Sequence, residues 1–341
     1  MKIGIIGPEG SGKSTVFACL TGLGVPAATR SPSLGVVRVP DNRLEVLSAM
    51  YQPKKTTPAE ITFVDLGSAG RHERLSAITG CLADADALAI VVGGLSPDSP
   101  GVALERFMLD LILADLSVVE NRLERLEKDW QRGRKEAAEE RDLMGRLQAA
   151  LSEGRRIAEV PLDEADEARL RGFQLTTRKP TVVLANVSEQ DLGNGVAQSV
   201  AAIAEPRALR TFELCAPLEA EIAELAHDER AAFLADYGLE CAATDRFIRA
   251  AYEMLDLISF FTVGPDEVRA WSVRRGTLAP RAAGRIHSDI ERGFIRAEVV
   301  AYEHLSTAGS MAACRAQGQV RLEGREYEVR DGDVIEFRFS V

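Results

Sequence analysis

The sequence predicts an α/β protein of 341 residues in which a mainly parallel sheet is interrupted by a helical insertion and followed by a small α+β module. Three patterns support this fold class. Short apolar runs alternate with helical segments in the first hundred residues. A heptad spacing of apolar residues follows them. Short β-rich pieces separated by glycine turns close the chain, and they are predicted as strands at SFFTV, VRAWSV, FIRAEVV, YEVR and VIEFRFSV.

Composition excludes several classes of protein. Hydrophobic residues make up 46% and charged residues 27%, as in an ordinary folded protein. No apolar stretch approaches the roughly 20 residues of a membrane helix, and the N-terminus does not resemble a signal peptide, so we expect a cytoplasmic protein without a membrane partner. The five cysteines form no CxxC pair, which argues against a zinc site or a disulfide framework. The net charge of −11 argues against DNA binding, so any RNA contact needs a local basic patch.

The N-terminal elements alternate as expected for an α/β domain. Apolar runs predict strands, and amphipathic segments between them predict helices. The predicted strands span residues 2–7, 35–39, 60–65, 87–92 and 180–185, with a further one at RTFEL (210–214). The predicted helices span residues 14–20, 42–50 and 73–83.

The segment from about residue 104 to residue 172 has a different pattern. Apolar residues are spaced alternately by three and four positions, which is a heptad seam on one helix. The seam is Leu109, Ile112, Leu116, Val119, Leu123, Leu126 and Trp130, and a second helix carries Leu143, Leu147 and Leu151. We expect an antiparallel helical hairpin that satisfies its seam internally, and therefore a monomer; two ordinary helices packed on the sheet are the alternative.

The strongest local motif is the glycine-rich loop at residues 7–14, GPEGSGKS, which satisfies G-x-x-x-x-G-K-[ST]. It follows an apolar strand and opens a helix, which is the context that such a phosphate-binding loop requires. Backbone N–H groups and the helix N-terminus then face the phosphates, Lys13 neutralises them, and Ser14 is a ligand of Mg²⁺. The predicted nucleotide-binding residues here are Gly7, Gly10, Ser11, Gly12, Lys13, Ser14 and Thr15.

Polar residues at the ends of later strands complete the predicted site. Asp65 ends a strand and is a candidate Mg²⁺ ligand. Asn186 and Glu189 follow the 180–185 strand, where α/β sheets bind ligands, although this loop is also compatible with a plain turn. Cys215, Ala216 and Pro217 follow the RTFEL strand and are a weaker signal.

These residues resemble the YchF family of Obg-related P-loop NTPases along nearly the whole chain. The most specific stretches are PKKTTPAEITFVD (53–65), ADLSVVENRLERLEK (114–128), LANVSE (184–189), LEAEIAELA (218–226), the segment 268–303 and the segment 321–341. The resemblance implies a Ras-like G domain with a coiled-coil insertion and a C-terminal TGS domain, which is a ubiquitin-like β-grasp module. The expected boundaries are 1–103 plus 173–257, 104–172 and 258–341.

The resemblance also implies the nucleotide and the partner. Guanine-specific relatives of the fold use Asn-Lys-x-Asp, whereas this chain has Asn186, Val187 and Glu189, so we expect ATP to bind at least as well as GTP. The family's association with ribosomes favours an RNA contact through the acid-free run between residues 269 and 285. Its arginines are Arg269, Arg274, Arg275, Arg281 and Arg285. The alternative is that they pair with acids while Trp271 packs in the core.

Two switch loops depart from the family's pattern. Ser68 replaces the glycine of the Asp-x-x-Gly switch, and the first switch is shortened, with Thr29 as its candidate Mg²⁺ ligand. His72 is a candidate for positioning water, although a solvent-exposed role is the simpler interpretation. The favoured function is a slow ATP/GTP-hydrolysing switch on ribosomes or RNA. A nucleotide-binding scaffold with little hydrolysis and, less favoured, a small-molecule kinase are the alternatives.

Overall fold

The computed structural model describes residues 1–25, 32–65, 82, 84–96, 98–132, 138–225, 227–239 and 241–340. Contacts divide the chain into two compact units. The first comprises Met1–Gly35 and Thr62–Thr244, and the second comprises Val36–Ile61 and Asp245–Val341. Among the described helices, none has the length and apolar character needed to cross a membrane.

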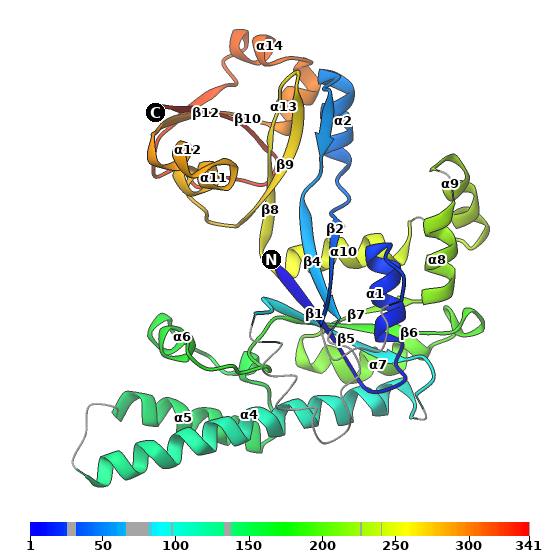
Figure 1. The fold of residues 1–341 in the computed structure, drawn as a ribbon, viewed down its shortest axis with the longest axis vertical. Coiled ribbons are helices and arrows are strands. Elements are labelled where there is room, and N and C mark those ends of the chain that lie inside the picture. Colours follow the sequence, from blue (N-terminus) through cyan, green and yellow to red (C-terminus); the bar gives the residue numbers. More distant parts are fainter. Residues whose placement is uncertain are drawn as a thin grey trace. The chain divides into compact units, whose positions relative to one another are not determined.

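A six-stranded sheet forms the frame of the first unit (Figure 1). Its order is β2-β4-β1-β5-β6-β7, and β4, β1, β5, β6 and β7 pair in parallel, which confirms the predicted parallel sheet. All seven residues of β5 are buried, as expected for a central parallel strand. The strands are β1 (Lys2–Ile6), β2 (Ser33–Arg38), β4 (Glu60–Asp65), β5 (Ala87–Gly93), β6 (Thr181–Asn186) and β7 (Arg210–Leu214).

Helices connect these strands and cover the sheet. Apolar side chains of the sheet, α4 and α7 share one core, which includes Ile90, Met108 and Val200. The helices are α1 (Lys13–Thr21), α4 (Pro100–Gln131), α5 (Ala138–Ser152), α6 (Glu164–Leu170), α7 (Val196–Ala204), α8 (Ala216–Glu224) and α9 (His227–Asp236), with short 3₁₀ turns η1 (Ile157–Glu159), η2 (Glu189–Asp191) and η3 (Glu205–Arg207).

The predicted helical hairpin is present as α4 and α5, which lie side by side (Figure 1). Arg122 pairs with Glu140, and Gln148 donates to Glu120, so the two helices run antiparallel. Leu109 does not join the seam, because its side chain is 50% exposed. At that point α4 packs on β5 and α7, and Met108 and Leu111 supply the buried face instead.

A buried carboxylate joins α4 to the loop before β6. Asp115 has 0% exposed surface and accepts hydrogen bonds from the Thr176 and Thr177 N–H groups and from the Thr177 hydroxyl, at 2.9, 2.7 and 2.6 Å. Burial raises the pKa of Asp115, although these donors act in the opposite direction. Three donors on one carboxylate compensate for removing it from water.

The second unit is an α+β module around another six-stranded sheet, ordered β11-β10-β12-β8-β9-β3. Its β8–β9 hairpin is followed by α11, and β12 returns parallel to β8, which is the arrangement of a β-grasp module. The strands are β3 (Lys55–Thr57), β8 (Leu257–Thr262), β9 (Glu267–Arg274), β10 (Phe294–Ala301), β11 (Arg321–Glu323) and β12 (Asp333–Phe339). The helices are α2 (Asn42–Tyr51), α10 (Ala243–Met254), α11 (Ala279–Ile286), α12 (Ser288–Arg292), α13 (Tyr302–Ala308) and α14 (Met311–Ala316).

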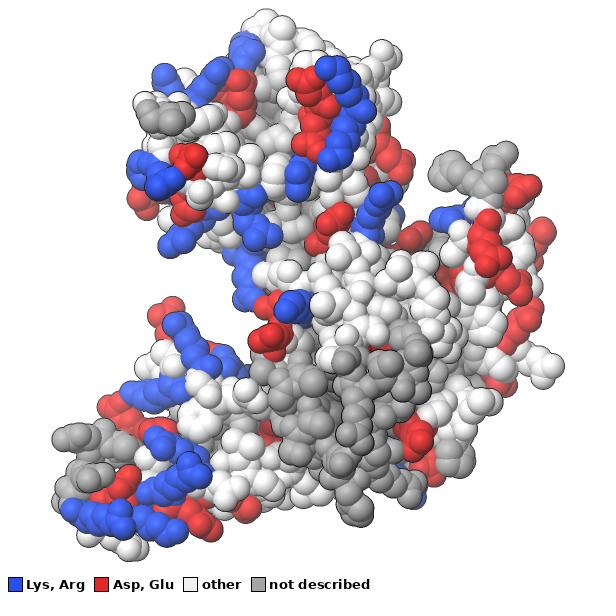
Figure 2. All heavy atoms as spheres, viewed as in Figure 1, with Lys and Arg blue, Asp and Glu red and all other residues white. Residues whose placement is uncertain are grey.

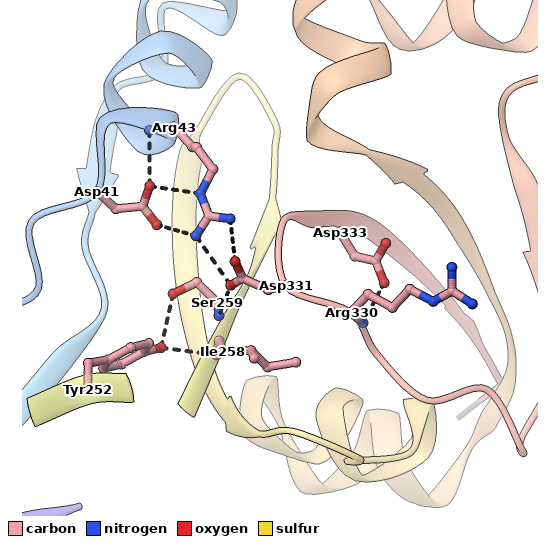
Figure 3. A network of polar contacts seen from close by, with 8 residues as sticks. All are labelled: Asp41, Arg43, Tyr252, Ile258, Ser259, Arg330, Asp331 and Asp333. Carbon is pink, nitrogen blue, oxygen red and sulfur yellow. Dashed lines mark hydrogen bonds and ion pairs between the residues drawn. The ribbon is translucent and has the colours of Figure 1, made fainter. Parts of the chain in front are cut away.

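A polar network holds α2 in this unit (Figure 3). Asp41 caps α2 by accepting from the Arg43 N–H at 3.0 Å, and the Arg43 guanidinium bonds both Asp41 and Asp331. Asp331 also accepts from the Ser259 N–H at 2.9 Å, and the Ser259 hydroxyl lies 2.9 Å from the Tyr252 hydroxyl. The network therefore connects α2, the start of β8, the turn before β12 and the end of α10.

A second charge cluster joins side chains of β10, β12 and α14. Glu298 accepts from Arg315 at 2.8 Å and from Arg338 at 2.9 Å. These two guanidinium groups, Arg315 foremost, hold the pKa of Glu298 below its usual range.

The structure differs from the sequence-based expectation in the placement of residues 36–61 and in one predicted strand. Residues 36–61 pack with the C-terminal module, where β3 pairs in parallel with β9, although we expected them in the nucleotide domain. The predicted strand at YEVR (327–330) is wrong, since only an isolated bridge between Leu278 and Glu328 forms there. The predicted helix at 73–83 lies almost entirely outside the described residues, and the division into three domains stays a prediction.

Candidate functional site

The glycine-rich loop lies between β1 and α1, at the carboxyl edge of the parallel strands. Gly7 has φ +150°, and a Cβ atom there would lie 2.1 Å from the Val91 carbonyl oxygen. Gly12 has φ +83°, and a Cβ atom there would lie 2.3 Å from Asn186 Nδ2. The two positions therefore require glycine for backbone conformation and for close approach.

Three polar side chains stand inside or next to this loop. The buried Ser11 hydroxyl donates to the Pro8 carbonyl at 2.9 Å, and Lys13 Nζ donates to the same oxygen at 2.7 Å. Ser14 is half-buried in the first turn of α1, whereas Thr15 is exposed. The ammonium and the Ser14 hydroxyl thus lie at the N-terminal end of α1, where the helix dipole favours an anion.

The loop that follows β5 holds the phosphate loop through hydrogen bonds, and it was not among the site residues predicted from the sequence. The Leu95 N–H donates to the Gly10 carbonyl at 2.8 Å, and the Gly94 N–H donates to the Asn186 carbonyl at 2.9 Å. Gly94 has φ +63°, and a Cβ atom there would lie 2.7 Å from the Gly10 carbonyl oxygen. The Gly93-Gly94 pair directly after a buried apolar strand was the available signal.

Asn186 connects the three loops of the site. Its side chain is buried with 7% exposed surface. Nδ2 donates to the Ser11 carbonyl at 3.1 Å, and Oδ1 accepts from the Ala216 N–H at 3.3 Å. The end of β6 is therefore fixed to the phosphate loop on one side and to the start of α8 on the other.

Ala216 is held from a second direction as well. Its carbonyl accepts a hydrogen bond from the Cys19 thiol of α1 at 3.0 Å. Burial raises the pKa of Cys19 to about 11, so this thiol remains protonated and remains a donor at neutral pH. Cys215 is buried and Pro217 is exposed in the first turn of α8. The predicted Cys215-Ala216-Pro217 segment thus lies beside α1 and Asn186.

The two other residues of the predicted base-reading loop lie in different surroundings. Val187 is buried, and its N–H donates to the Leu214 carbonyl at 2.9 Å. Glu189 is exposed in η2, and its Oε1 accepts from the Tyr237 hydroxyl at 2.9 Å. Tyr237 follows α9 and was not among the predicted site residues, because no local motif marks it.

The predicted metal ligands are only partly within the described residues. Asp65 ends β4, is 1% exposed and lies opposite Ile5 of β1, one residue before the strand ends at the phosphate loop. Its carboxylate and the Ser14 hydroxyl offer the hard oxygen ligands that suit Mg²⁺. Thr29 and His72 lie outside the described residues. Across the described part of the chain, no group of three or more His, Cys, Asp or Glu side chains is placed to hold a metal.

The five predicted RNA-contacting arginines all lie in the second unit. Arg274, Arg275, Arg281 and Arg285 are exposed, and Arg269 stacks on the Trp271 ring, 3.9 Å from its centroid. Figure 2 shows basic and acidic side chains close to one another over this unit.

Both interpretations of this run have support in the contacts. Arg275 pairs with Asp256 at 3.2 Å and Arg281 with Glu291 at 3.5 Å, and Trp271 packs against the core with its indole N–H on Thr262. Exposed ion pairs of this kind contribute little and exchange readily. The pairs therefore do not prevent these arginines from contacting phosphate.

A parallel sheet whose first strand runs through a G-x-x-x-x-G-K-S loop into a helix, with loops after β5, β6 and β7 packed around it, defines a P-loop NTPase. The comparisons agree with this class. The family model YchF-GTPase_C, described as a protein of unknown function (DUF933), matches residues 257–340. The ribosome-binding ATPase YchF of Bacillus subtilis (strain 168) is 39% identical over 100% of both chains.

Two further relatives extend the comparison. The ribosome-binding ATPase YchF of Escherichia coli O157:H7 is 35% identical over 100% of this chain and 99% of its own. The solved structure of the Schizosaccharomyces pombe YchF GTPase is 26% identical and superposes with a TM-score of 0.86 over 99% of this chain and 97% of that one. The chain belongs to the YchF family.

Proposed function

We propose that this protein is a Mg²⁺-dependent nucleoside triphosphatase that accepts ATP at least as well as GTP, hydrolyses it slowly and acts as a ribosome-associated switch. One observation carries the proposal: hydrogen bonds from neighbouring loops hold the phosphate loop in place. Asn186 and Leu95 hydrogen-bond its carbonyl oxygens from two neighbouring strand ends. A loop held in this way has the backbone geometry that presents N–H groups to an anion.

The charges of the site suit a triphosphate. Lys13 and the N-terminus of α1 supply positive potential in a chain whose net charge is −11. Lys13 Nζ lies 2.7 Å from the Pro8 carbonyl, so it is already held inside the loop. Catalysis then depends on positioning and on stabilising the charge of the transition state.

Mg²⁺ fits the same corner. Ser14 and Asp65 would hold it, with the remaining ligands from phosphate oxygens and water. The ion supplies neutralisation of the phosphate charge during transfer. The buried position of Asp65 keeps its carboxylate within the sheet edge rather than in bulk water.

The base-reading loop supports the choice of nucleotide. Guanine recognition normally uses a carboxylate that accepts two hydrogen bonds, with a lysine stem packed on the base. Val187 is buried away from such a role, and Glu189 already accepts from a hydroxyl. The preference for guanine is therefore weakened, and ATP is accepted.

The proposal of a ribosome as partner comes from the relatives, which are named ribosome-binding ATPases. Charge distribution supports the same partner. Residues 257–340 contain 12 Arg, no Lys and 12 Asp plus Glu, so this segment has no net charge while the whole chain carries −11. This segment thus repels RNA less than the rest of the chain, and its exposed arginines are the proposed phosphate contacts.

Phosphate release tests the proposal directly. Purified protein is assayed with ATP and with GTP, with and without ribosomes, beside Lys13→Ala. Slow release that ribosomes accelerate and that Lys13→Ala abolishes supports the switch. Calorimetry with both nucleotides adds the specificity, and a strong preference for GTP contradicts that part of the proposal.

The second candidate is a nucleotide-binding scaffold with little or no hydrolysis. The observation that favours it is Ser68, which stands where the family's switch has glycine. Nucleotide binding that is lost in Lys13→Ala, without phosphate release above the level of that variant, would select the scaffold.

A further inference from the structure

Tyr237 contacts the base-reading loop from a different element. It lies one residue after α9 ends at Asp236, and its side chain is 41% exposed. Its ring lies 5.2 Å from the ring of Phe233, with an interplanar angle of 34°. Its hydroxyl donates to Glu189 Oε1 at 2.9 Å. The hydroxyl is therefore presented to the carboxylate by a ring that is itself held by a neighbour.

This hydroxyl is a donor at neutral pH. The hydrogen bond to Glu189 raises the pKa of Tyr237, and the charges of Glu189 and Glu221 act in the same direction. Nearby on the same loop, Asp191 is occupied by the Ser188 hydroxyl at 2.7 Å. Glu189 is thus the acidic side chain of η2 to which Tyr237 donates its hydrogen bond.

The two purines present different edges to such a carboxylate. Guanine offers two donors, N1–H and the N2 amino group, and an ionised carboxylate with both oxygens available accepts both. Adenine offers one donor, the N6 amino group, next to the acceptor N1. A carboxylate that has already accepted a hydroxyl at one oxygen is a poorer partner for two donors, whereas one donor needs only the other oxygen.

We propose that Tyr237 is a specificity-determining residue of the nucleotide site, which disfavours guanine by occupying Oε1 of Glu189. The inference rests on the proposed function, because it assumes that the loop of Glu189 faces the base. It adds to that function a residue that follows α9 and that the Asn-x-x-Glu motif does not contain. Tyr237 acts through Glu189 and is a positioning residue.

Tyr237→Phe is the direct test, since it removes the hydroxyl and keeps the ring against Phe233. Dissociation constants for Mg-ATP and Mg-GTP are measured by calorimetry on the full chain. We expect GTP to gain about three- to tenfold relative to ATP, which corresponds to one hydrogen bond of ordinary strength. A change of stability alone would move both constants together and leave their ratio unchanged.

Two further variants make the test specific. Tyr302→Phe removes a tyrosine hydroxyl in the second unit and is expected to leave the ratio unchanged. In a Glu189→Ala background, Tyr237→Phe is also expected to have no effect on the ratio, because the hydroxyl acts through the carboxylate.

The outcomes separate this inference from the function on which it rests. An unchanged GTP/ATP ratio in Tyr237→Phe, or an equal change without Glu189, overturns the role of Tyr237 while nucleotide binding stands. If Tyr237→Phe does not fold, Tyr237→Leu at the same position with the same ratio measurement replaces it. If the unmodified protein binds neither nucleotide, the proposed function fails first.

Discussion

Replacing Asn186 with alanine tests the central contact of the site. The side chain donates to the Ser11 carbonyl and accepts from the Ala216 N–H, and Ala216 is only 1% exposed. Truncation removes two hydrogen bonds and leaves a buried N–H without its acceptor. At about 0.5–1.5 kcal/mol for each bond and about 1–3 kcal/mol for a stranded donor, the free energy of unfolding should fall by roughly 2–6 kcal/mol.

Nucleotide binding should suffer as well. The phosphate loop loses its hydrogen bond to the end of β6. Gly12 also loses its close contact with the Asn186 side-chain amide, which lies next to the position that a Cβ atom would take. We expect the dissociation constants for Mg-ATP and Mg-GTP to rise at least about tenfold, since fixed N–H geometry is what the loop contributes to binding. Calorimetry measures the affinities, and urea unfolding followed by circular dichroism measures the stability.

The matched control is Asn194→Ala. This asparagine lies in the same connection between β6 and α7, but it is exposed, and its side chain donates to the carbonyl of Gln190 within the same loop. It should leave both quantities within about 0.5 kcal/mol, as surface substitutions usually do. If Asn186→Ala behaves like this control, Asn186 does not brace the site and the reasoning is refuted.

Three further substitutions have predicted outcomes. Gly12→Ala should abolish nucleotide binding in a thermal-shift assay, because its φ of +83° and the 2.3 Å approach of Asn186 leave no space for a methyl group; unchanged protection by Mg-ATP would contradict this. Asp115→Ala should lower the free energy of unfolding by about 3–5 kcal/mol in urea titrations, since it strands two buried N–H groups and a hydroxyl; a loss below about 1 kcal/mol would argue against it. Glu298→Gln should lower the melting temperature at neutral pH, and this difference from the unmodified protein should shrink in acid. The lowered pKa of Glu298 in the folded protein gives stability that is present above the usual value of about 4.3 and is lost as the pH falls through the folded pKa. The two melting temperatures should therefore converge between about pH 5 and pH 3, and a difference that does not change with pH would refute the ion-pair account.

The phosphate loop could be predicted because its information is local. Eight consecutive residues specify the turn, the cation and the helix start, and the preceding apolar run specifies the strand. The strand ends that carry Asp65 and Asn186 were also predictable, since parallel strands bring their carboxyl ends to one edge. The observed sheet places both there.

Other contacts depend on tertiary packing and have no local signal. Tyr237 reaches Glu189 across 48 positions of sequence, and only the placement of α9 brings them together. Leu109 continues the heptad spacing, yet α4 buries a different face where it leaves α5 and packs on the sheet. The YEVR segment alternates like a strand but forms only a single bridge.

Residues 36–61 have a consequence for dissecting the protein. They lie in the chain between Gly35 and Thr62, yet their partners, β9 for β3 and Asp331 for Arg43, come from the last hundred residues. Deleting the C-terminal residues would therefore leave α2 and β3, in the middle of the remaining polypeptide, without their packing partners. The same segment is joined covalently, through β2 and β4, to the stretches that hold Thr29 and Ser68. The backbone itself is therefore a direct route by which a conformational change on nucleotide binding could reach the C-terminal module.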